Sequence, residues 1–141
     1  MLIALWLFLG LLLGAGFIAF ERAVVTDERL FFAIGLWVVG FIYLGFAAIG
    51  DGTTWPGIEA LGIALYGGMG ILGMFRSPRW LVVGWAAHPV WDIALHFFGD
   101  GSAFTPEAYS ISCVSFDLLV AVYIATRLKK WHGTNLDFET I

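Results

Sequence analysis

Two histidines and an aspartate are spaced four residues apart in the segment HPVWDIALH, which covers residues 88–96. His88, Asp92 and His96 would share one face of a helix, because each step of four residues turns only about 40°. Imidazole and carboxylate groups ligate zinc and non-haem iron, and they also act as general acids and bases. The two histidines would lie about 12 Å apart along the helix axis, so one ion cannot easily bind both.

Two further carboxylates stand at matching depths in neighbouring apolar segments. Counting about 1.5 Å per residue from the helix ends puts Glu59 level with His96, near the outer surface. The same count puts Asp117 level with His88, near the middle of the membrane. We therefore expect the pairs His96–Glu59 and His88–Asp117, with Asp92 between them.

These five residues are the candidate metal ligands, and His88, Asp92 and Asp117 are also the candidate catalytic groups. One divalent ion, zinc or iron, would use a histidine and aspartate four residues apart together with Glu59 or Asp117. Two ions that share Asp92 are the other arrangement. The metal-free alternatives are a His–carboxylate acid–base system and a structural polar clasp that holds three helices together.

The elements that would position these residues are apolar helices. Of the 141 residues, 60% are hydrophobic and 13% are charged, whereas soluble domains carry about 25% charged residues. Five apolar runs approach the roughly 20 residues that a spanning helix needs. We predict an all-α integral membrane protein, a five-transmembrane-helix bundle with spans over about residues 2–20, 30–49, 57–75, 80–98 and 107–127.

The basic residues predict the orientation of the bundle. All seven Lys and Arg residues fall between the first two runs, between the third and fourth, or after the fifth. Because Lys and Arg accumulate on the cytoplasmic side, we expect the N-terminus outside and the C-terminus in the cytoplasm, in the cell (inner) membrane. Residues 1–128 would form one transmembrane domain, and residues 129–141 a short polar cytoplasmic tail.

Partners follow from the same patterns. The lipid bilayer is the main one, and topology accounts for the basic residues, so no nucleic acid is expected. The small interior of such a bundle is compatible with a homo-oligomer. The polar groups gather in the outer half of the membrane, and no ionisable relay continues inward from Asp117. This predicts an outward-facing pocket that is closed toward the cytoplasm.

The motif GWAAHPVWDIALH, followed by SISCVSFD, resembles a small multi-pass membrane family of bacteria and fungi whose function is unknown. The pattern of that family is G-W-x-x-H-x-x-W-D-x-x-x-H and then S-x-x-C-x-x-x-D, with a glutamate in an earlier span that WPGIE matches here. The resemblance covers about the last three spans and implies a shared site. Beyond the five candidate ligands, the residues that depth or this resemblance places around the site are Tyr43, Tyr66, Trp85, Trp91, Ser110 and Cys113.

Three functions remain open from the sequence. The first is a metal-binding membrane protein, and an enzyme of the metal-dependent or acid–base kind is compatible with it; its ligand would be a small or lipophilic molecule. The second is a non-enzymatic accessory or oligomeric membrane subunit. The third is an ion- or proton-coupled transporter, which would need polar groups or water in the inner half.

Overall fold

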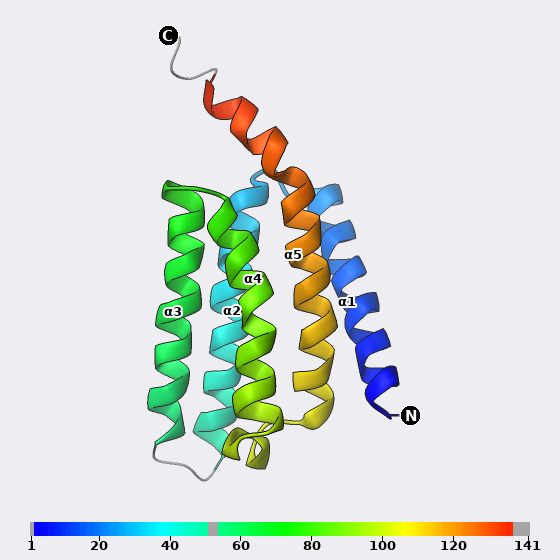
Figure 1. Cartoon of the computed structure of the whole chain (residues 1–141), viewed down its shortest axis with the longest axis vertical. Helices are drawn as coiled ribbons and strands as arrows, with labels where there is room; N and C mark the ends of the chain where they lie inside the picture. Colours follow the sequence, from blue (N-terminus) through cyan, green and yellow to red (C-terminus); the bar gives the residue numbers. More distant parts are fainter. Residues whose placement is uncertain (1, 51–53, 137–141) are drawn as a thin grey trace.

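The computed structural model describes residues 2–50 and 54–136, and all regular elements in these ranges are helical (Figure 1). Six of the seven elements in these ranges form a bundle of five roughly parallel and antiparallel rods, and a short 3₁₀-helix joins the last two rods. The elements are α1 (Leu2–Val24), α2 (Glu28–Ile49), α3 (Trp55–Phe75), α4 (Arg79–Trp91), the π-helix η1 (Asp92–Phe97), the 3₁₀-helix η2 (Asp100–Ala103) and α5 (Glu107–Leu136).

Four of these helices, α1, α2, α3 and α5, are long and apolar enough to cross a membrane. Their 21 or more residues correspond to about 30 Å, the thickness of the hydrocarbon core. The predicted fourth span, residues 80–98, is not one continuous α-helix: α4 has 13 residues and η1 has six. Together they run the length of the bundle between α3 and α5 (Figure 1).

Local signals in the sequence explain where the helices begin. Asp27 caps α2, and its carboxylate accepts a hydrogen bond of 3.0 Å from the backbone N–H of Leu30. Pro56 stands in the first turn of α3, where its missing N–H costs nothing. Pro78 precedes α4 in the tight turn from α3. At the other end of the chain, α5 continues to Leu136, so the predicted tail begins inside a helix, and residues 137–141 of that tail lie outside the described residues.

The bundle assembles from two pairs of helices and a connecting rod. Helix α1 packs on α5, α2 packs on α3, and α4 fills the space between α3 and α5. Gly10 allows the first pairing, because a Cβ atom there would overlap the backbone carbonyl of Ser112. The hydroxyl of Ser112 donates to the carbonyl of Trp6 at 3.0 Å, and that of Ser115 donates to the carbonyl of Leu7 at 2.7 Å.

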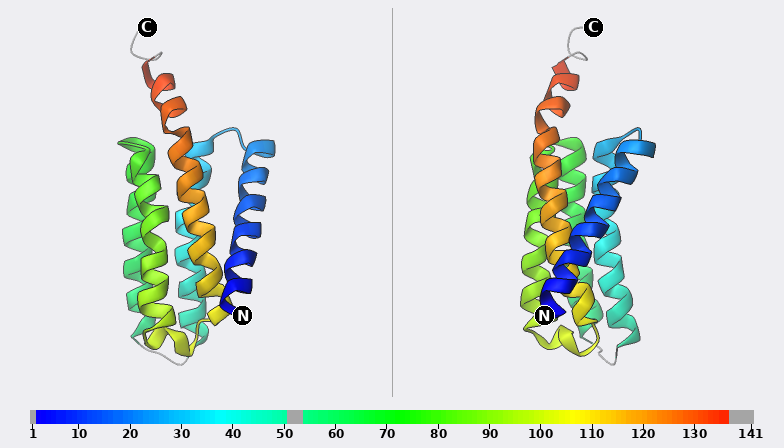
Figure 2. Two further views of the ribbon diagram at one scale, coloured as in Figure 1. Left: turned by 45° about the vertical axis from the view of Figure 1, so that its right-hand side comes forward. Right: turned by 90° about the vertical axis from the view of Figure 1, so that its right-hand side faces the viewer.

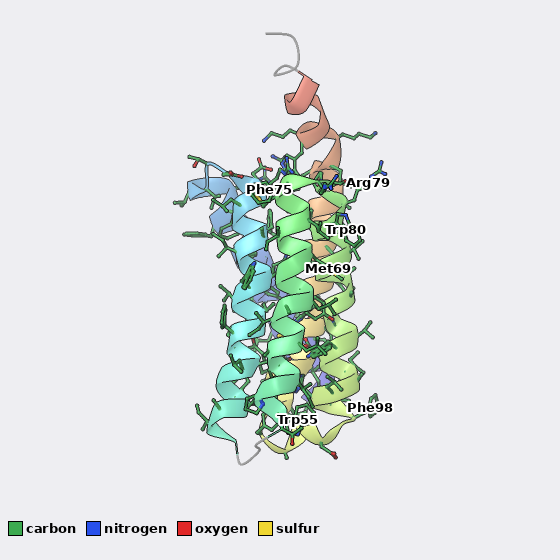
Figure 3. All side chains as sticks on the ribbon, turned by 90° about the vertical axis from the view of Figure 1, so that its left-hand side faces the viewer. Trp55, Met69, Phe75, Arg79, Trp80 and Phe98 are labelled. Carbon is green, nitrogen blue, oxygen red and sulfur yellow. The ribbon has the colours of Figure 1, made fainter. Side chains whose placement is uncertain are left out.

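All seven Lys and Arg residues lie in or beside the α1–α2 connection, the α3–α4 turn or the C-terminal part of α5. These segments meet at one end of the bundle, which we call the basic end (Figures 1 and 2). Arg79 marks this end in Figure 3, and Trp55 marks the opposite end. Arg127 and Lys130 of α5 both contact the carboxylate of Glu28 there, Arg127 through Nε at 2.9 Å.

The side chains on the outside of the bundle are largely apolar. Phe75 is 82% exposed at the basic end and Phe98 is 78% exposed at the opposite end (Figure 3). Trp80 and Trp55 accompany them at the two ends, in the manner of the aromatic belts of membrane proteins. A surface of this kind is stable against lipid rather than against water.

The interior divides into two layers. Toward the basic end lies an apolar core that joins α2, α4 and α5. Its central side chains are no more than 1% exposed: Phe32, Leu36, Leu81, Trp85, Val120 and Ile124. Toward the opposite end the interior is polar, and the candidate site residues lie there.

Candidate functional site

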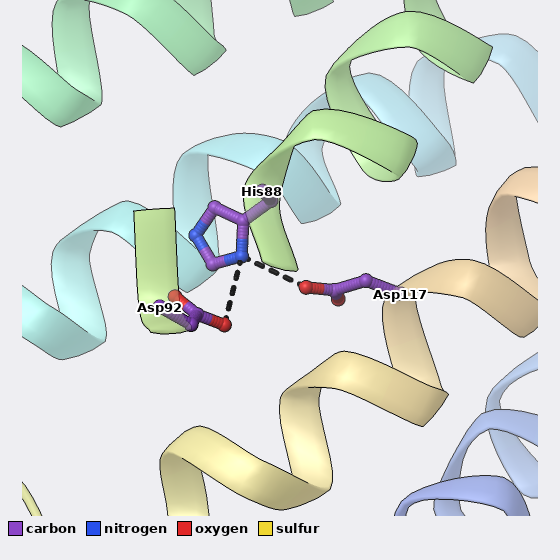
Figure 4. A group of neighbouring side chains, drawn as sticks. All are labelled: His88, Asp92 and Asp117. Atoms are coloured by element: carbon purple, nitrogen blue, oxygen red, sulfur yellow. Dashed lines mark hydrogen bonds and ion pairs between the residues drawn. The ribbon is translucent and has the colours of Figure 1, made fainter. Parts of the chain in front are cut away.

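His88 lies between two aspartates inside the bundle (Figure 4). Its Nδ1 atom is 2.8 Å from Oδ2 of Asp117 on α5 and 3.4 Å from Oδ2 of Asp92 at the start of η1. Each of the three residues offers one ligand atom, and these atoms all lie within 4.8 Å of one another. The structure thus brings together His88 and Asp117, a pair that the sequence predicted, and Asp92, which was expected between the two pairs.

The electrostatics of this group are unbalanced. All three side chains are at most 1% exposed, and a buried carboxylate needs a partner for its charge. One imidazole nitrogen faces both carboxylates, and a single N–H can donate a good hydrogen bond to only one of them. Both oxygens of Asp92 and Oδ1 of Asp117 have no hydrogen-bond partner. Even a charged imidazolium would leave one negative charge over.

The break in the fourth rod places Asp92 and His96. Pro89 lies inside α4 and has no N–H, so it cannot donate to the carbonyl four residues earlier. Three residues later the hydrogen-bonding pattern widens, and the N–H of Phe98 donates to the carbonyl of Ile93 at 3.0 Å. π-Helical turns of this kind occur frequently at functional sites. Here the turn carries two of the five candidate ligands.

A second pair lies next to the first group. Nε2 of His96 is 3.3 Å from Oε1 of Glu59 on α3, the pairing expected from their equal depth. Both side chains are buried, and neither of these two atoms has a hydrogen-bond partner. The other ring nitrogen of His96, Nδ1, is 3.3 Å from Oγ1 of Thr105.

Tyr43 and Tyr66 surround the two histidines. The Tyr43 ring stacks on His96 with the centroids 4.1 Å apart, and its centroid is 5.9 Å from that of His88. Tyr66 meets His88 edge-on at 4.9 Å, and its hydroxyl is 3.4 Å from the carbonyl of Ala87. The Tyr43 hydroxyl is buried without a hydrogen-bond partner. The two tyrosines predicted around the site are therefore in place.

The other predicted neighbours have different surroundings. Trp91 packs on Tyr66 and over Gly62 of α3. Trp85 belongs to the apolar core instead, and its Nε1–H donates to the carbonyl of Phe32 at 3.1 Å. Cys113 and Ser110 are buried on α5, and the Ser110 hydroxyl has no hydrogen-bond partner.

Sequence reasoning missed the contacts that surround His96. Thr105 and Gly101 come from the connection between η1 and α5, and a Cβ atom on Gly101 would be 2.6 Å from Nδ1 of His96. The rings of Trp55 and Phe104 lie about His96, with centroids 6.0 and 6.1 Å from its own. The pairing of Thr and Pro in SAFTPEA could have suggested a helix start, but nothing in it indicates a contact nine residues back.

A cavity lies at the end of the bundle where the sequence predicted an open pocket. Its volume is about 430 Å³, and Trp55, Phe104 and Asp100 are among its lining residues. The candidate ligands are buried below it, and Trp55 and Phe104 both line the cavity and contact the His96 ring. The structure thus has a pocket at this end, but aromatic rings separate it from the buried histidines.

A second cavity is apolar and lies between α1, α2 and α5. It has a volume of about 330 Å³ and follows α2 from Phe31 to Ile42. Tyr109 and Cys113 of α5 line it as well, and the Tyr109 ring also contacts Tyr43 at 5.4 Å. The cavity therefore reaches the residues that surround the polar site.

On the side of the basic end, the apolar core follows directly after the site. Val120 and Ile124, one and two turns beyond Asp117 on α5, are both fully buried. The next buried carboxylate along the bundle among the described residues is that of Glu21, which accepts a hydrogen bond of 2.9 Å from the Tyr123 hydroxyl. An apolar layer thus separates it from the site.

A model of one protein family, described as a family of unknown function (DUF6010), matches residues 5–130. The match includes parts of all five helical rods, among them the two N-terminal helices that carry no part of the motif. No curated protein and no solved structure matches the chain.

Proposed function

The chain belongs to the DUF6010 family of unknown function, and we propose that it is an integral membrane protein that binds a divalent metal ion between His88, Asp92 and Asp117. The observation that carries the proposal is the closeness of their three ligand atoms, all within 4.8 Å. A doubly charged cation would neutralise the two carboxylates while the imidazole stays neutral. The same ion would give the unpartnered carboxylate oxygens a partner.

The ligand set suits zinc or iron and leaves room for chemistry. One nitrogen and two oxygen donors are borderline ligands that both metals accept. Three protein ligands leave at least one coordination position open, as in catalytic rather than structural zinc sites. This favours a site that binds or transforms a ligand over one that only stabilises the fold.

We further infer a chain with five spans in the cell (inner) membrane, its N-terminus outside. The rod formed by α4 and η1 has 19 residues in all (13 + 6), which is about the number that a span requires. The gathering of all seven basic residues at one end supports a cytoplasmic location for that end. The metal site then lies in the outer half of the membrane.

Metal analysis of the purified protein tests the proposal. We expect wild-type protein in detergent to retain zinc or iron through gel filtration, as measured by elemental mass spectrometry. Asp117→Asn keeps the shape of the side chain but removes a charged ligand, so it should lower metal affinity at least tenfold, the scale of effect seen even for groups behind the ligands.

Glu21→Gln is the matched control, because Glu21 is also a buried carboxylate but lies beyond the apolar core. It should retain the metal of the wild type. Wild-type protein that carries no zinc or iron, and takes up neither when dialysed against them, would contradict the proposal.

One observation favours a structural clasp as the alternative. The two His–carboxylate pairs link the fourth rod to α5 and to α3, so they could hold the bundle together without any metal. A clasp predicts a large loss of thermal stability in Asp117→Asn and no effect of a chelator on wild-type protein. A metal site predicts that the chelator itself lowers the melting temperature, since a ligand that binds the native state stabilises it.

Transport receives less support. A proton or ion pathway needs polar groups or water across the whole membrane. The apolar layer of Phe32, Trp85, Val120 and Ile124 beyond the site argues against such a pathway.

A further inference from the structure

The pair of Glu59 and His96 has an unusual geometry. Oε1 of Glu59 and Nε2 of His96 are 3.3 Å apart and are both fully enclosed. The two atoms nevertheless do not form a hydrogen bond, and neither has another partner. Two buried polar atoms that face each other in this way need a partner that both can bind, because their burial is otherwise uncompensated.

The contacts of the His96 ring indicate which kind of partner the two atoms would share. Nδ1 of His96 is 3.3 Å from the hydroxyl of Thr105. If the N–H is on Nδ1 and donates to that hydroxyl, Nε2 presents its lone pair toward a carboxylate oxygen, which is repulsive. A cation between the two atoms would turn this repulsion into attraction. Metal-bound histidines typically donate the N–H of their other nitrogen in the same manner.

The separation of the two atoms also suits a metal. Zinc binds nitrogen and oxygen ligands at about 2.0–2.1 Å, and two such ligands of a tetrahedral ion lie about 3.3–3.4 Å apart. The separation in the structure is 3.3 Å. The distance from Nδ1 of His88 to Oδ2 of Asp92, 3.4 Å, lies in the same range.

Asp92, which belongs to the group with His88 and Asp117, is the candidate bridge to the second pair. It is fully buried and neither of its oxygens has a hydrogen-bond partner. It lies four residues from each histidine along the chain. A carboxylate has two oxygens, so it can give one to each of two ions.

We propose that the site holds two divalent ions bridged by Asp92, one between His88 and Asp117 and the second between His96 and Glu59. The inference rests on the proposed metal-binding function and extends it to a second ion. Three carboxylates and two neutral imidazoles then hold four positive charges. The remaining positive charge suits a ligand with an anionic oxygen, such as a carboxylate or a phosphate ester. Two-metal sites typically activate water or bind such oxygens.

Metal stoichiometry tests this inference with the whole protein in detergent. Metal-free protein is titrated with Zn²⁺, and bound zinc is measured after gel filtration. We expect about two equivalents per chain for the wild type. Glu59→Gln and His96→Gln should each retain about one, because they remove a ligand of the second ion only. Asp92→Asn should lose affinity for both ions.

Two further measurements make the test specific. Glu21→Gln, the buried carboxylate beyond the apolar core, should still bind about two equivalents. Electron paramagnetic resonance of Co²⁺-loaded protein should show coupling between two ions in the wild type and in Glu21→Gln, and none in Glu59→Gln. The coupling reports the bridge itself, which a merely structural role for Glu59 would not produce.

The outcomes separate the two proposals. About one equivalent in the wild type, lost in Asp117→Asn and kept in Glu59→Gln, would overturn the second ion and leave the first in place. Two equivalents that Glu59→Gln and His96→Gln both retain would overturn the inference as well, since the second ion would then lie elsewhere. No bound zinc in the wild type would overturn both proposals.

Discussion

At the scale of single residues, the position of His96 depends on the neighbours that enclose its ring. His96 is enclosed by the stacked ring of Tyr43 on one side and by the backbone of Gly101 on another. Its Nδ1 atom is oriented by Thr105. The orientation of the imidazole therefore depends on the absence of a side chain at residue 101.

This dependence predicts the effect of Gly101→Ala. The new Cβ atom would lie 2.6 Å from Nδ1 of His96 and 2.6 Å from the carbonyl oxygen of Leu95, so something must move. We expect a loss of about 1–3 kcal/mol of stability, typical of overpacking, together with weaker metal binding. Thermal unfolding in detergent and metal analysis measure the two effects.

Gly68→Ala provides the comparison. Nothing lies within 4 Å of a Cβ atom at Gly68 in the middle of α3, and alanine favours a helix over glycine by about 0.5–1 kcal/mol. This variant should be as stable as the wild type or more so, with unchanged metal content. Equal behaviour of the two variants would mean that the backbone at Gly101 does not position His96.

At the scale of elements, the arrangement of the helix pairs creates the apolar cavity. Because α1 packs on α5 while α2 packs on α3, α1 and α2 diverge (Figure 2), and the apolar cavity is lined by residues of both helices and of α5. The cavity follows α2 over 12 residues, from Phe31 to Ile42, which corresponds to about 16 Å. An apolar space of this length would suit one acyl chain. We therefore infer a lipophilic ligand for the neighbouring site.

Val38→Trp should fill this cavity, because Val38 lines it and is 48% exposed. We expect native mass spectrometry to show lipid bound to the wild type and at least tenfold less bound to the variant. Val122→Trp on α5 is the matched control, since Val122 is 64% exposed and does not line the cavity. A lipid that stays bound in Val38→Trp as in the control would exclude the cavity as its position.

At the scale of the whole molecule, charge is distributed between the two ends. The basic end carries all seven Lys and Arg residues, whereas the loops at the opposite end have none. In between, the surface is apolar and the interior holds the buried polar site. This distribution predicts the side of the membrane on which the site lies.

Cysteine labelling of intact cells tests this orientation. The chain has one cysteine, Cys113, so a Cys113→Ser background allows single new cysteines. Asp100→Cys at the opposite end should react with an impermeant maleimide from outside. Thr26→Cys, exposed between α1 and α2, should react only after the cells are permeabilised. The reverse pattern would place the basic end outside and the site in the inner half of the membrane.

The sequence by itself determined the helical class, the length of the apolar segments and the pairing partners across them. These follow from local properties: hydropathy selects the segments, and equal depth in parallel rods brings His88 to Asp117 and His96 to Glu59. The helical period also put Asp92 on the face of both histidines. Such features need only the regular geometry of a helix.

Only the tertiary structure decided how these groups are enclosed. The switch from α4 to the π-helix η1 at Asp92 and the approach of Thr105 and Gly101 to His96 depend on contacts between separate segments. The apolar cavity depends on how α1 and α2 diverge, and the placement of Trp85 in the core depends on its contacts with Phe32 and Gly35 of α2. Depth and period are properties of one helix, whereas burial and the absence of hydrogen-bond partners arise only when several helices pack together.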